Sequence, residues 1–330
     1  MKRVAQYLRI GEWMSSKVIM MLGALAYFVC LSDIEMAGAV RQLVVYFLFL
    51  SMFLAISYVV NDLSDLESDR KAGKQKVIAG LPRRVVWISL GAMLLAGDVP
   101  IMAVAYDKTA CLLLIAITTF LGLAYSVPGI RFKEKGAWGL VECSFAQRCM
   151  PLTLILLFIE RNRTNILLWV LWFLLSFLNG IRYILIHQYI DRENDRASGT
   201  HTFVLDRQVG IRQWILYCCV AEFVCCAALL IPLMRDYAPV VVVGVLASLV
   251  LEYCICQVLN VMAKKDWLVS FDSVPLELFY NIVFPLCLGI CMMKKSVWAA
   301  LFCAFTFICT FRSFKVKLGI AMVYIRRKKP

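Results

Sequence analysis

The sequence predicts an all-α membrane protein whose helices cross the bilayer nine or ten times. Of its 330 residues, 62% are hydrophobic, whereas soluble domains contain roughly 45–50% apolar residues. Several uninterrupted apolar runs reach the ~18 residues that indicate a membrane-spanning helix. The chain lacks the alternating ~10-residue segments that are typical of a membrane β-barrel. We therefore expect one polytopic helical domain that covers residues 1–330.

Ten apolar runs place the expected helices, each close to the ~20 residues that one crossing requires. They cover residues 17–33, 39–60, 85–105, 109–126, 139–159, 166–190, 211–233, 237–262, 274–293 and 296–312. Only Lys294 and Lys295 separate the last two runs, which therefore count as one helix or two. Residues 1–16 combine apolar side chains with Lys2, Arg3 and Arg9, a pattern that favours a short basic helix at the membrane surface.

The distribution of basic residues predicts the orientation of the chain. If the N-terminus is cytoplasmic, 26 of the 35 Lys and Arg residues lie on that side, 7 lie on the other, and Arg148 and Arg182 lie inside spans. Such an excess is the usual mark of cytoplasmic loops. It also accounts for the net charge of +13 without nucleic-acid binding, because the cations are spread over many short loops.

An acid-rich nonapeptide occurs twice in the chain. The copies at residues 65–73 and 191–199 share the pattern Asp-x-Glu-x-Asp-Arg-x-x-Gly, and their offset is constant (191 − 65 = 126). They end the second and sixth expected helices, which predicts a pseudo-repeat of helices 1–4 and 5–8. By the charge asymmetry, both copies face the cytoplasm.

Each copy ends a polar stripe, because residues three or four apart share one face of a helix. The first stripe contains Tyr58, Asn61, Asp62, Asp65 and Asp69, and the second contains Asn179, Tyr183, His187, Asp191 and Asp195. One such cluster alone is explained as a charged helix end in water. Two clusters in register, each on a stripe that enters the membrane, favour a functional site.

Carboxylates in this number suit Mg²⁺, which binds through a few carboxylates together with substrate phosphates. The neighbouring cations fit the same substrate, since Arg70, Lys76, Arg192 and Arg196 are placed to neutralise phosphate oxygens. The sequence therefore predicts two acidic helix ends that are bridged by metal ions and a diphosphate.

Several stretches resemble the UbiA superfamily of intramembrane prenyltransferases. Residues 61–69 resemble its NDxxDxxxD motif, and Asp191 with Asp195 resembles its second motif, DxxxD. Residues 76–82 and 123–133 are similar to the segments that follow the first motif and the fourth helix, although Val77 and Gly129 replace usual prolines. Gly199, Thr202 and Gly210 match the end of the second motif.

The resemblance implies nine helices around a central cavity with a cytoplasmic cap. It implies that Asp62, Asp65, Asp69, Asp191 and Asp195 bind Mg²⁺, the expected cofactor, and that Asn61, Asp65 and Asp191 are catalytic. The diphosphate would be bound by Asn61, Arg70, Lys76, Arg131, Lys133, Arg192 and Arg196. The expected partners are a prenyl diphosphate donor, a small-molecule acceptor and membrane lipid, with no nucleic acid and no inferable protein partner.

The apolar part of the cavity is expected to stabilise an allylic cation through aromatic faces such as Tyr58, Tyr125 and Tyr183. His187, one turn from Asp191, is a candidate for contact with the acceptor or for proton acceptance. Arg148 and Asn179 are placed on the acceptor side. An alternative remains open, in which Arg182, Arg148 and Glu142, of which the last two share one span, pair with each other or with Asp98, Glu222, Glu252 or Glu277.

These features predict a Mg²⁺-dependent prenyltransferase that releases diphosphate. A terpene cyclase of the same superfamily uses the same metal motifs and remains the main alternative. A CDP-alcohol phosphotransferase is disfavoured because neither acidic copy has Asp-Gly before Ala-Arg. A transporter, in which the repeat would serve alternating access and the acids would bind a cation, would hold its acids near the membrane midplane, whereas these acids end helices.

Overall fold

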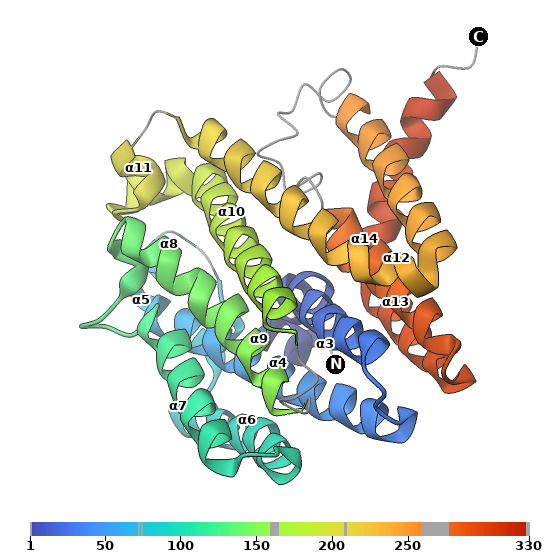
Figure 1. Cartoon of the computed structure of the whole chain (residues 1–330). Coiled ribbons are helices and arrows are strands. Elements are labelled where there is room, and N and C mark those ends of the chain that lie inside the picture. The colour runs from blue at the N-terminus through green and yellow to red at the C-terminus, as the bar shows by residue number, and fades with distance from the viewer. Residues whose placement is uncertain are drawn as a thin grey trace.

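The computed structural model describes residues 2–71, 73, 75–158, 165–207, 210–258 and 277–327, and within these ranges every regular element is helical. Figure 1 shows the helices gathered into one bundle. The first half contains α1 (Lys2–Tyr7), α2 (Ile10–Trp13), α3 (Ile19–Leu31), α4 (Met36–Ser64), α5 (Leu66–Lys71), α6 (Arg83–Val104) and α7 (Lys108–Ala124). The second half contains α8 (Ala137–Ser144), α9 (Met150–Leu154), α10 (Ile166–Ser198), α11 (Phe203–Arg207), α12 (Ile211–Gln257), α13 (Phe284–Met293) and α14 (Ala300–Arg327).

The expected apolar helices form where the structure describes the chain. Six helical stretches have the length and composition of membrane spans, namely Ile10–Leu31, Met36–Ser64, Arg83–Val104, Ala137–Leu157, Ile166–Glu193 and Ile211–Gln257. Three shorter apolar helices cover Lys108–Ala124, Phe279–Met293 and Val297–Phe311. The number of crossings, expected to be nine or ten, is not confirmed by these stretches and stays a prediction. Residues 159, 259–262 and 274–276, at the ends of expected spans, lie outside the described ranges.

α12 contains the expected helix 211–233 and the described part of the expected helix 237–262, which meet at a kink. Tyr237 leaves the helical conformation at φ −133° and ψ 20°, between Pro232 and Pro239. A proline inside a helix removes a backbone hydrogen bond and clashes with the preceding turn, which explains the bend.

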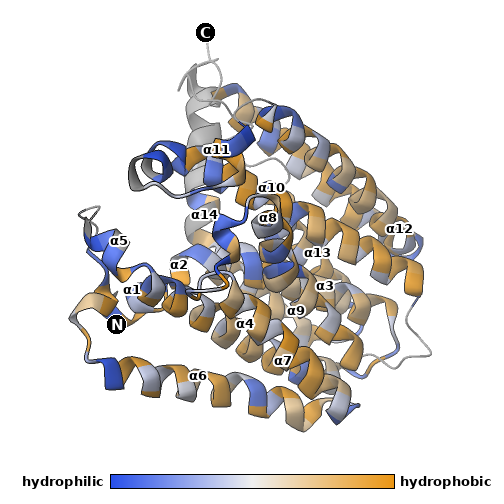
Figure 2. Cartoon of the chain, turned by 90° about the vertical axis from the view of Figure 1, so that its left-hand side faces the viewer, coloured by the Kyte–Doolittle hydropathy of each residue, from blue (hydrophilic) through white to orange (hydrophobic). Residues whose placement is uncertain are grey.

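Polar residues gather at one end of the bundle. Figure 2 shows hydrophilic residues concentrated on α5 and α11, whereas hydrophobic residues dominate α3, α4, α7, α12 and α13. The short helices α5 and α11 follow α4 and α10; the first acidic nonapeptide begins at Asp65, directly after α4, and the second ends α10. The acidic ends of α4 and α10 are therefore followed by polar segments.

α3 lies at the centre of the apolar core, because every residue from Ile19 to Cys30 is buried. It connects the two halves of the molecule. The Tyr27 hydroxyl donates to the carbonyl of Leu229 in α12 at 2.9 Å, and the ring of Tyr27 packs edge-on against Trp172 of α10.

Two glycines permit close helix packing beside the cavity described below. A Cβ atom at Gly122 of α7 would lie 2.7 Å from the ring of Phe53 in α4, and one at Gly180 of α10 would lie 2.9 Å from the Cα of Ser144 in α8. Larger side chains at either position would push the helices apart. The glycines thus set the spacing of the walls that carry the polar residues.

Candidate active site

A cavity of about 750 Å³ opens between α4, α7, α8 and α10, and the N-terminal segment also contributes to its wall. Its charged lining residues are Arg9, Lys17, Asp65, Asp69, Arg131, Lys133, Arg148, Asp191 and Asp195. The cavity is therefore a strongly polar space inside an apolar bundle. Buried charge of this kind in a membrane protein is costly and usually functional.

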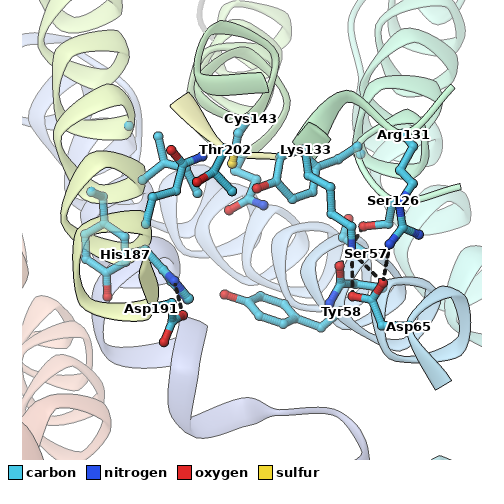
Figure 3. Close-up of a pocket in the computed structure, with 18 of the residues that line it drawn as sticks. Ser57, Tyr58, Asp65, Ser126, Arg131, Lys133, Cys143, His187, Asp191 and Thr202 are labelled. Atoms are coloured by element: carbon cyan, nitrogen blue, oxygen red, sulfur yellow. Dashed lines mark hydrogen bonds and ion pairs between the residues drawn. The ribbon is translucent and has the colours of Figure 1, made fainter. Parts of the chain in front are cut away.

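The two acidic helices form matching walls of the cavity. Five pairs of lining residues share the sequence offset of 126, namely Ser57 and Tyr183, Tyr58 and Ile184, Asn61 and His187, Asp65 and Asp191, and Asp69 and Asp195. Figure 3 shows Asp65 and Asp191 on opposite sides of the pocket, with the side chain of Tyr58 projecting between them. The duplicated acids thus face one shared space.

On the α4 side, cations from the segment after α7 hold Asp65. Lys133 donates to both carboxylate oxygens of Asp65, and Arg131 Nη2 lies 3.1 Å from its Oδ1. Burial lowers the pKa of Arg131, but hydrogen bonding to Glu134 and the charge of Asp65 outweigh it, so that the pKa is raised. The backbone of Arg131 is left-handed at φ 43°, a strained conformation that is often found at functional sites.

The neighbouring Asn61 is also fixed from this segment, because its Oδ1 accepts a hydrogen bond from Ser126 Oγ at 2.7 Å. Tyr125 lines the cavity beside Ser126, where its phenol offers a hydrogen-bonding and aromatic group.

On the α10 side, His187 Nδ1 lies 2.8 Å from Asp191 Oδ2. Both side chains are partly exposed, at 49% and 40%, so this wall is open to the aqueous end of the cavity. Thr200 and Thr202, which follow the end of α10, also line the cavity.

Asp62, an expected metal ligand, does not line the cavity. Its Oδ1 lies 2.9 Å from both Arg9 Nη1 and Lys76 Nζ, and Lys76 also lies 3.7 Å from Asp69. Burial lowers the pKa of Arg9, but Glu12 and Asp62 outweigh it, so that the pKa is raised. Asp62 therefore joins the N-terminal segment to α4, and Lys76 reaches the site only through Asp62 and Asp69.

The inner part of the cavity carries a second group of cations. Lys17 Nζ donates to the Tyr58 hydroxyl at 2.9 Å and to the side-chain oxygen of Gln147. The Cζ atom of Arg148 lies 5.9 Å from the centre of the Tyr183 ring. Lys17 belongs to the π-helical turn Met14–Val18, and Arg148 belongs to the π-helical turn Phe145–Cys149. π-Helical turns are rare in proteins overall, and those that occur are often found at functional sites.

Asn179 does not line the cavity, in contrast to its expected place on the acceptor side. Its Nδ2 donates to Glu222 Oε2 at 3.3 Å, and Glu222 pairs with Arg182 at 2.6 and 2.8 Å. The reason is the helical period: every fourth residue turns about 40° beyond a full circle, so that Asn179 is rotated by about 120° from Asp191. The pairing of Arg182 with Glu222, one of the alternatives left open, is observed.

Three expected diphosphate-binding residues also lie away from the cavity, namely Arg70, Arg192 and Arg196. Arg70 and Arg196 are exposed, and Arg192 donates to the carbonyl of Tyr189 at 2.7 Å. Arg192 follows Asp191 directly, and consecutive helical residues point about 100° apart. If Asp191 faces the cavity, Arg192 faces away from it.

Sequence reasoning did not identify Arg9, Lys17 and Gln147 as cavity residues. In the sequence, Lys17 and Arg9 indicated only the orientation of the chain in the membrane, because cations are common before a first span. Gln147 stands beside Arg148 inside an apolar span, and a polar residue in such a position was a usable signal.

The carboxylates that line the cavity are suited to a hard cation that a bound ligand also coordinates. Among the described residues, no three His, Cys, Asp or Glu side chains gather closely enough to hold a metal ion by themselves. Mg²⁺ does not require such a cage, because it binds through one or two carboxylates and completes its shell with waters and substrate phosphates. Asp65 with Asp69, and Asp191 with Asp195, offer two carboxylates on each wall.

The fold and the cavity define an all-helical membrane protein with an acidic, cation-rich site between two similar helical walls. A sequence profile of the UbiA prenyltransferase family matches residues 20–283. The chain therefore belongs to the UbiA family, whose members are prenyltransferases. A search of curated proteins finds no match.

Solved structures show the same fold. A UbiA homologue from Archaeoglobus fulgidus, bound to GPP and Mg²⁺, superposes with a TM-score of 0.57 at 16% identity, over 93% of this chain and 99% of that one. The apo structure of a UbiA homologue from Aeropyrum pernix K1 gives a TM-score of 0.53 at 14% identity, over 87% of this chain and 98% of that one. The expected UbiA-type bundle is thereby confirmed.

Proposed function

We propose that this chain transfers an isoprenyl group from a prenyl diphosphate to a small polar acceptor, with Mg²⁺ as cofactor and diphosphate as the product released. The observation that carries the proposal is the presence of Asp65, which directly follows α4, and Asp191 of α10 in one cavity with Arg131 and Lys133. The GPP and Mg²⁺ present in the Archaeoglobus fulgidus homologue support the same donor and metal.

The aspartates are assigned to metal binding, with Asp65 and Asp69 on one wall and Asp191 and Asp195 on the other. When bound, Mg²⁺ supplies charge that stabilises the departing diphosphate. Asp62 is left out of this set, because Arg9 and Lys76 already hold its carboxylate.

Arg131 and Lys133 are assigned to the diphosphate oxygens. In the structure both cations pair with Asp65. Asp65 thus holds them in a position from which they can also contact an anionic ligand. As the bond between the prenyl carbon and the diphosphate oxygen breaks, its electron pair goes to the oxygen. The two cations stabilise the charge that develops there.

The prenyl carbon then accepts an electron pair from the nucleophilic atom of the acceptor, which loses a proton. His187 lines the cavity and is the candidate base for this proton. The rings of Tyr58, Tyr125 and Tyr183 line the space where a carbocation must be kept from water.

The arrangement in the membrane is part of the proposal. The charge asymmetry of the sequence supports a cytoplasmic N-terminus and cytoplasmic acidic ends of α4 and α10. The repeated offset of 126 between lining residues supports a single domain built from two related halves.

The test uses full-length protein in lipid nanodiscs, incubated with geranyl or geranylgeranyl diphosphate, Mg²⁺ and a panel of acceptors. We expect Mg²⁺-dependent release of diphosphate, and loss of that release in Asp65→Asn and Asp191→Asn. Retained release in both variants would overturn the assignment. A cyclic hydrocarbon formed without any acceptor would identify a terpene cyclase instead.

A further inference from the structure

The N-terminal segment, residues 2–13, packs beside the acidic end of α4. The Tyr7 hydroxyl lies 2.6 Å from Ser89 Oγ of α6, and α1 contacts the 3₁₀ turn Val77–Gly80, which follows the first acidic motif. Figure 2 shows α1 and α2 at the same end of the bundle as α5. The segment is therefore folded against the chain that surrounds the first group of aspartates.

Arg9 is the residue through which this segment reaches the cavity, which it lines. Its Nη1 donates to Asp62 Oδ1 at 2.9 Å, and its guanidinium lies 4.8 Å from the centre of the Tyr58 ring. Its Nε and Nη2 donate to the two carboxylate oxygens of Glu12, which fixes the plane of the guanidinium. The backbone of Arg9 is left-handed at φ 51°, a strained conformation that the surrounding contacts must offset.

The helix that carries the first motif is interrupted at Asp65, where φ is −96° and ψ is 5°, and α5 begins at the next residue. Asp65 and Asp69, the two acids assigned to metal binding on this wall, therefore do not belong to one continuous helix. Side-chain contacts across the interruption must fix α5 relative to α4. Lys76 makes such contacts, because it lies 2.9 Å from Asp62 and 3.7 Å from Asp69.

Asp62 is the residue at which these contacts meet. Its side chain is buried, with the residue 5% exposed, and one oxygen, Oδ1, accepts from both Arg9 and Lys76. Removal of Arg9 would leave a buried carboxylate with only one of these two cations, which is costly. It would also release the N-terminal segment from the end of α4.

We propose that Arg9 is a positioning residue for the metal site and that it acts through Asp62. It holds Asp65 and Asp69 in the arrangement that binds Mg²⁺ together with the diphosphate. The inference rests on the proposed prenyl transfer and adds that the N-terminal segment supports the site. Outer contacts of this kind set metal affinity, because they orient the carboxylates that bind the ion. Arg9 precedes the residues matched by the family profile, 20–283, so family membership alone does not imply this role.

The experiment measures the Mg²⁺ concentration at which geranyl thiodiphosphate, a slowly reacting donor analogue, reaches half-maximal binding to full-length protein in lipid nanodiscs. We expect Arg9→Gln to raise this concentration at least about tenfold, while the affinity for the analogue at saturating Mg²⁺ stays within about threefold. Arg9→Lys, which retains the charge, should restore part of the effect. Arg3→Gln, at an exposed position on α1, is the matched control and should change nothing.

A double substitution tests whether Arg9 acts through Asp62. The variant Arg9→Gln with Asp62→Asn should resemble Asp62→Asn alone, because both changes remove the same contact. Additive effects would overturn the inference, since Arg9 would then act directly on the ligand. A loss of analogue affinity that persists at saturating Mg²⁺ would overturn it for the same reason.

Hydrogen exchange of the ligand-free protein gives a second readout that requires no donor. The amides of residues 61–71 should exchange faster in Arg9→Gln than in Arg3→Gln, whereas those of α12 should exchange at the same rate in both, which distinguishes local loosening from general destabilisation. Unchanged exchange at residues 61–71 would refute the positioning role. If the unaltered protein does not bind the analogue in the presence of Mg²⁺, the proposed function fails instead, and the exchange comparison still tests the link between Arg9 and α4.

Discussion

His187 and Asp191 are four residues apart on α10, and their Nδ1 and Oδ2 atoms lie 2.8 Å from each other on the cavity wall. A carboxylate that holds one ring nitrogen sets the tautomer and orientation of the imidazole. We predict that the other nitrogen is the one that meets the acceptor. We predict that His187→Gln lowers the turnover number by about 10²-fold, as expected for loss of a general base.

Binding of the donor should be unaffected by that change, since His187 lies outside the Arg131–Lys133 group. The measurement is single-turnover product formation beside equilibrium binding of geranyl thiodiphosphate. An equal loss of donor affinity and rate would show that His187 acts on the diphosphate rather than on the proton.

Lys133 donates to both oxygens of Asp65 and is predicted to bind the diphosphate. Lys133→Gln should weaken Mg²⁺-dependent donor binding by about tenfold or more, because a charge-assisted hydrogen bond contributes roughly 1.5–3 kcal/mol. Lys135→Gln is the matched control, since Lys135 is exposed, belongs to the same loop and does not line the cavity. Equal effects of the two substitutions would indicate only a general influence of positive charge.

Removal of divalent metal should stop donor consumption without unfolding the protein. Asp65 is paired with Arg131 and Lys133 in the structure, and Asp191 contacts His187, so these acids have partners in the absence of metal. We expect EDTA to abolish diphosphate release, Mg²⁺ to restore it, and the melting temperature to shift little. Release that persists in EDTA, with metal-free buffers verified by mass spectrometry, would contradict the metal assignment.

The close packing at Gly122 and Gly180 predicts a steric cost for any added side chain. Gly122→Ala would place a methyl group 2.7 Å from Phe53, and Gly180→Ala would place one 2.9 Å from Ser144 Cα. Each should destabilise the protein by about 1–3 kcal/mol through overpacking. Gly91→Ala, in α6 with nothing within 4 Å, is the control and should be neutral or slightly stabilising.

Thermal unfolding in detergent and donor binding are the two measurements for this series. Donor binding is included because both glycines line the cavity. If Gly122→Ala and Gly180→Ala behaved like Gly91→Ala, the close approach of the helices would be refuted.

The fully buried pair of Arg182 and Glu222 joins α10 to α12, with Nε and Oε1 2.6 Å apart. Removal of one partner should cost about 3–5 kcal/mol, because the other charge stays buried. The double substitution Arg182→Gln with Glu222→Gln should cost less than the sum of the two single changes. Unfolding midpoints of the four proteins give the coupling directly, and simple additivity would mean that the pair does not interact.

The prediction of the elements from the sequence succeeded where long apolar runs decide the structure. Helices occupy the expected runs within the described residues, and α12 joins two of them at a kink between Pro232 and Pro239. The placement of Asp65 and Asp191 in one cavity followed from the repeated motif and was predicted. Runs of this length leave the backbone no alternative to helix in a membrane, because its polar groups must be satisfied within the segment.

The helical membrane fold, the two acidic helix ends and the family were all predictable from the amino-acid sequence. The face of each helix that meets the cavity depends instead on how the helices pack. In the packed structure Asn179 donates to Glu222 and does not line the cavity. Asp62 pairs with Arg9 and Lys76, and Lys17 donates to Gln147. A spacing of four residues does not keep side chains on one face over a long helix, because each step rotates the side chain by about 40° beyond a full turn. Contacts between residues 130 positions apart, such as that of Lys17 with Gln147, depend on how the helices pack rather than on any local pattern.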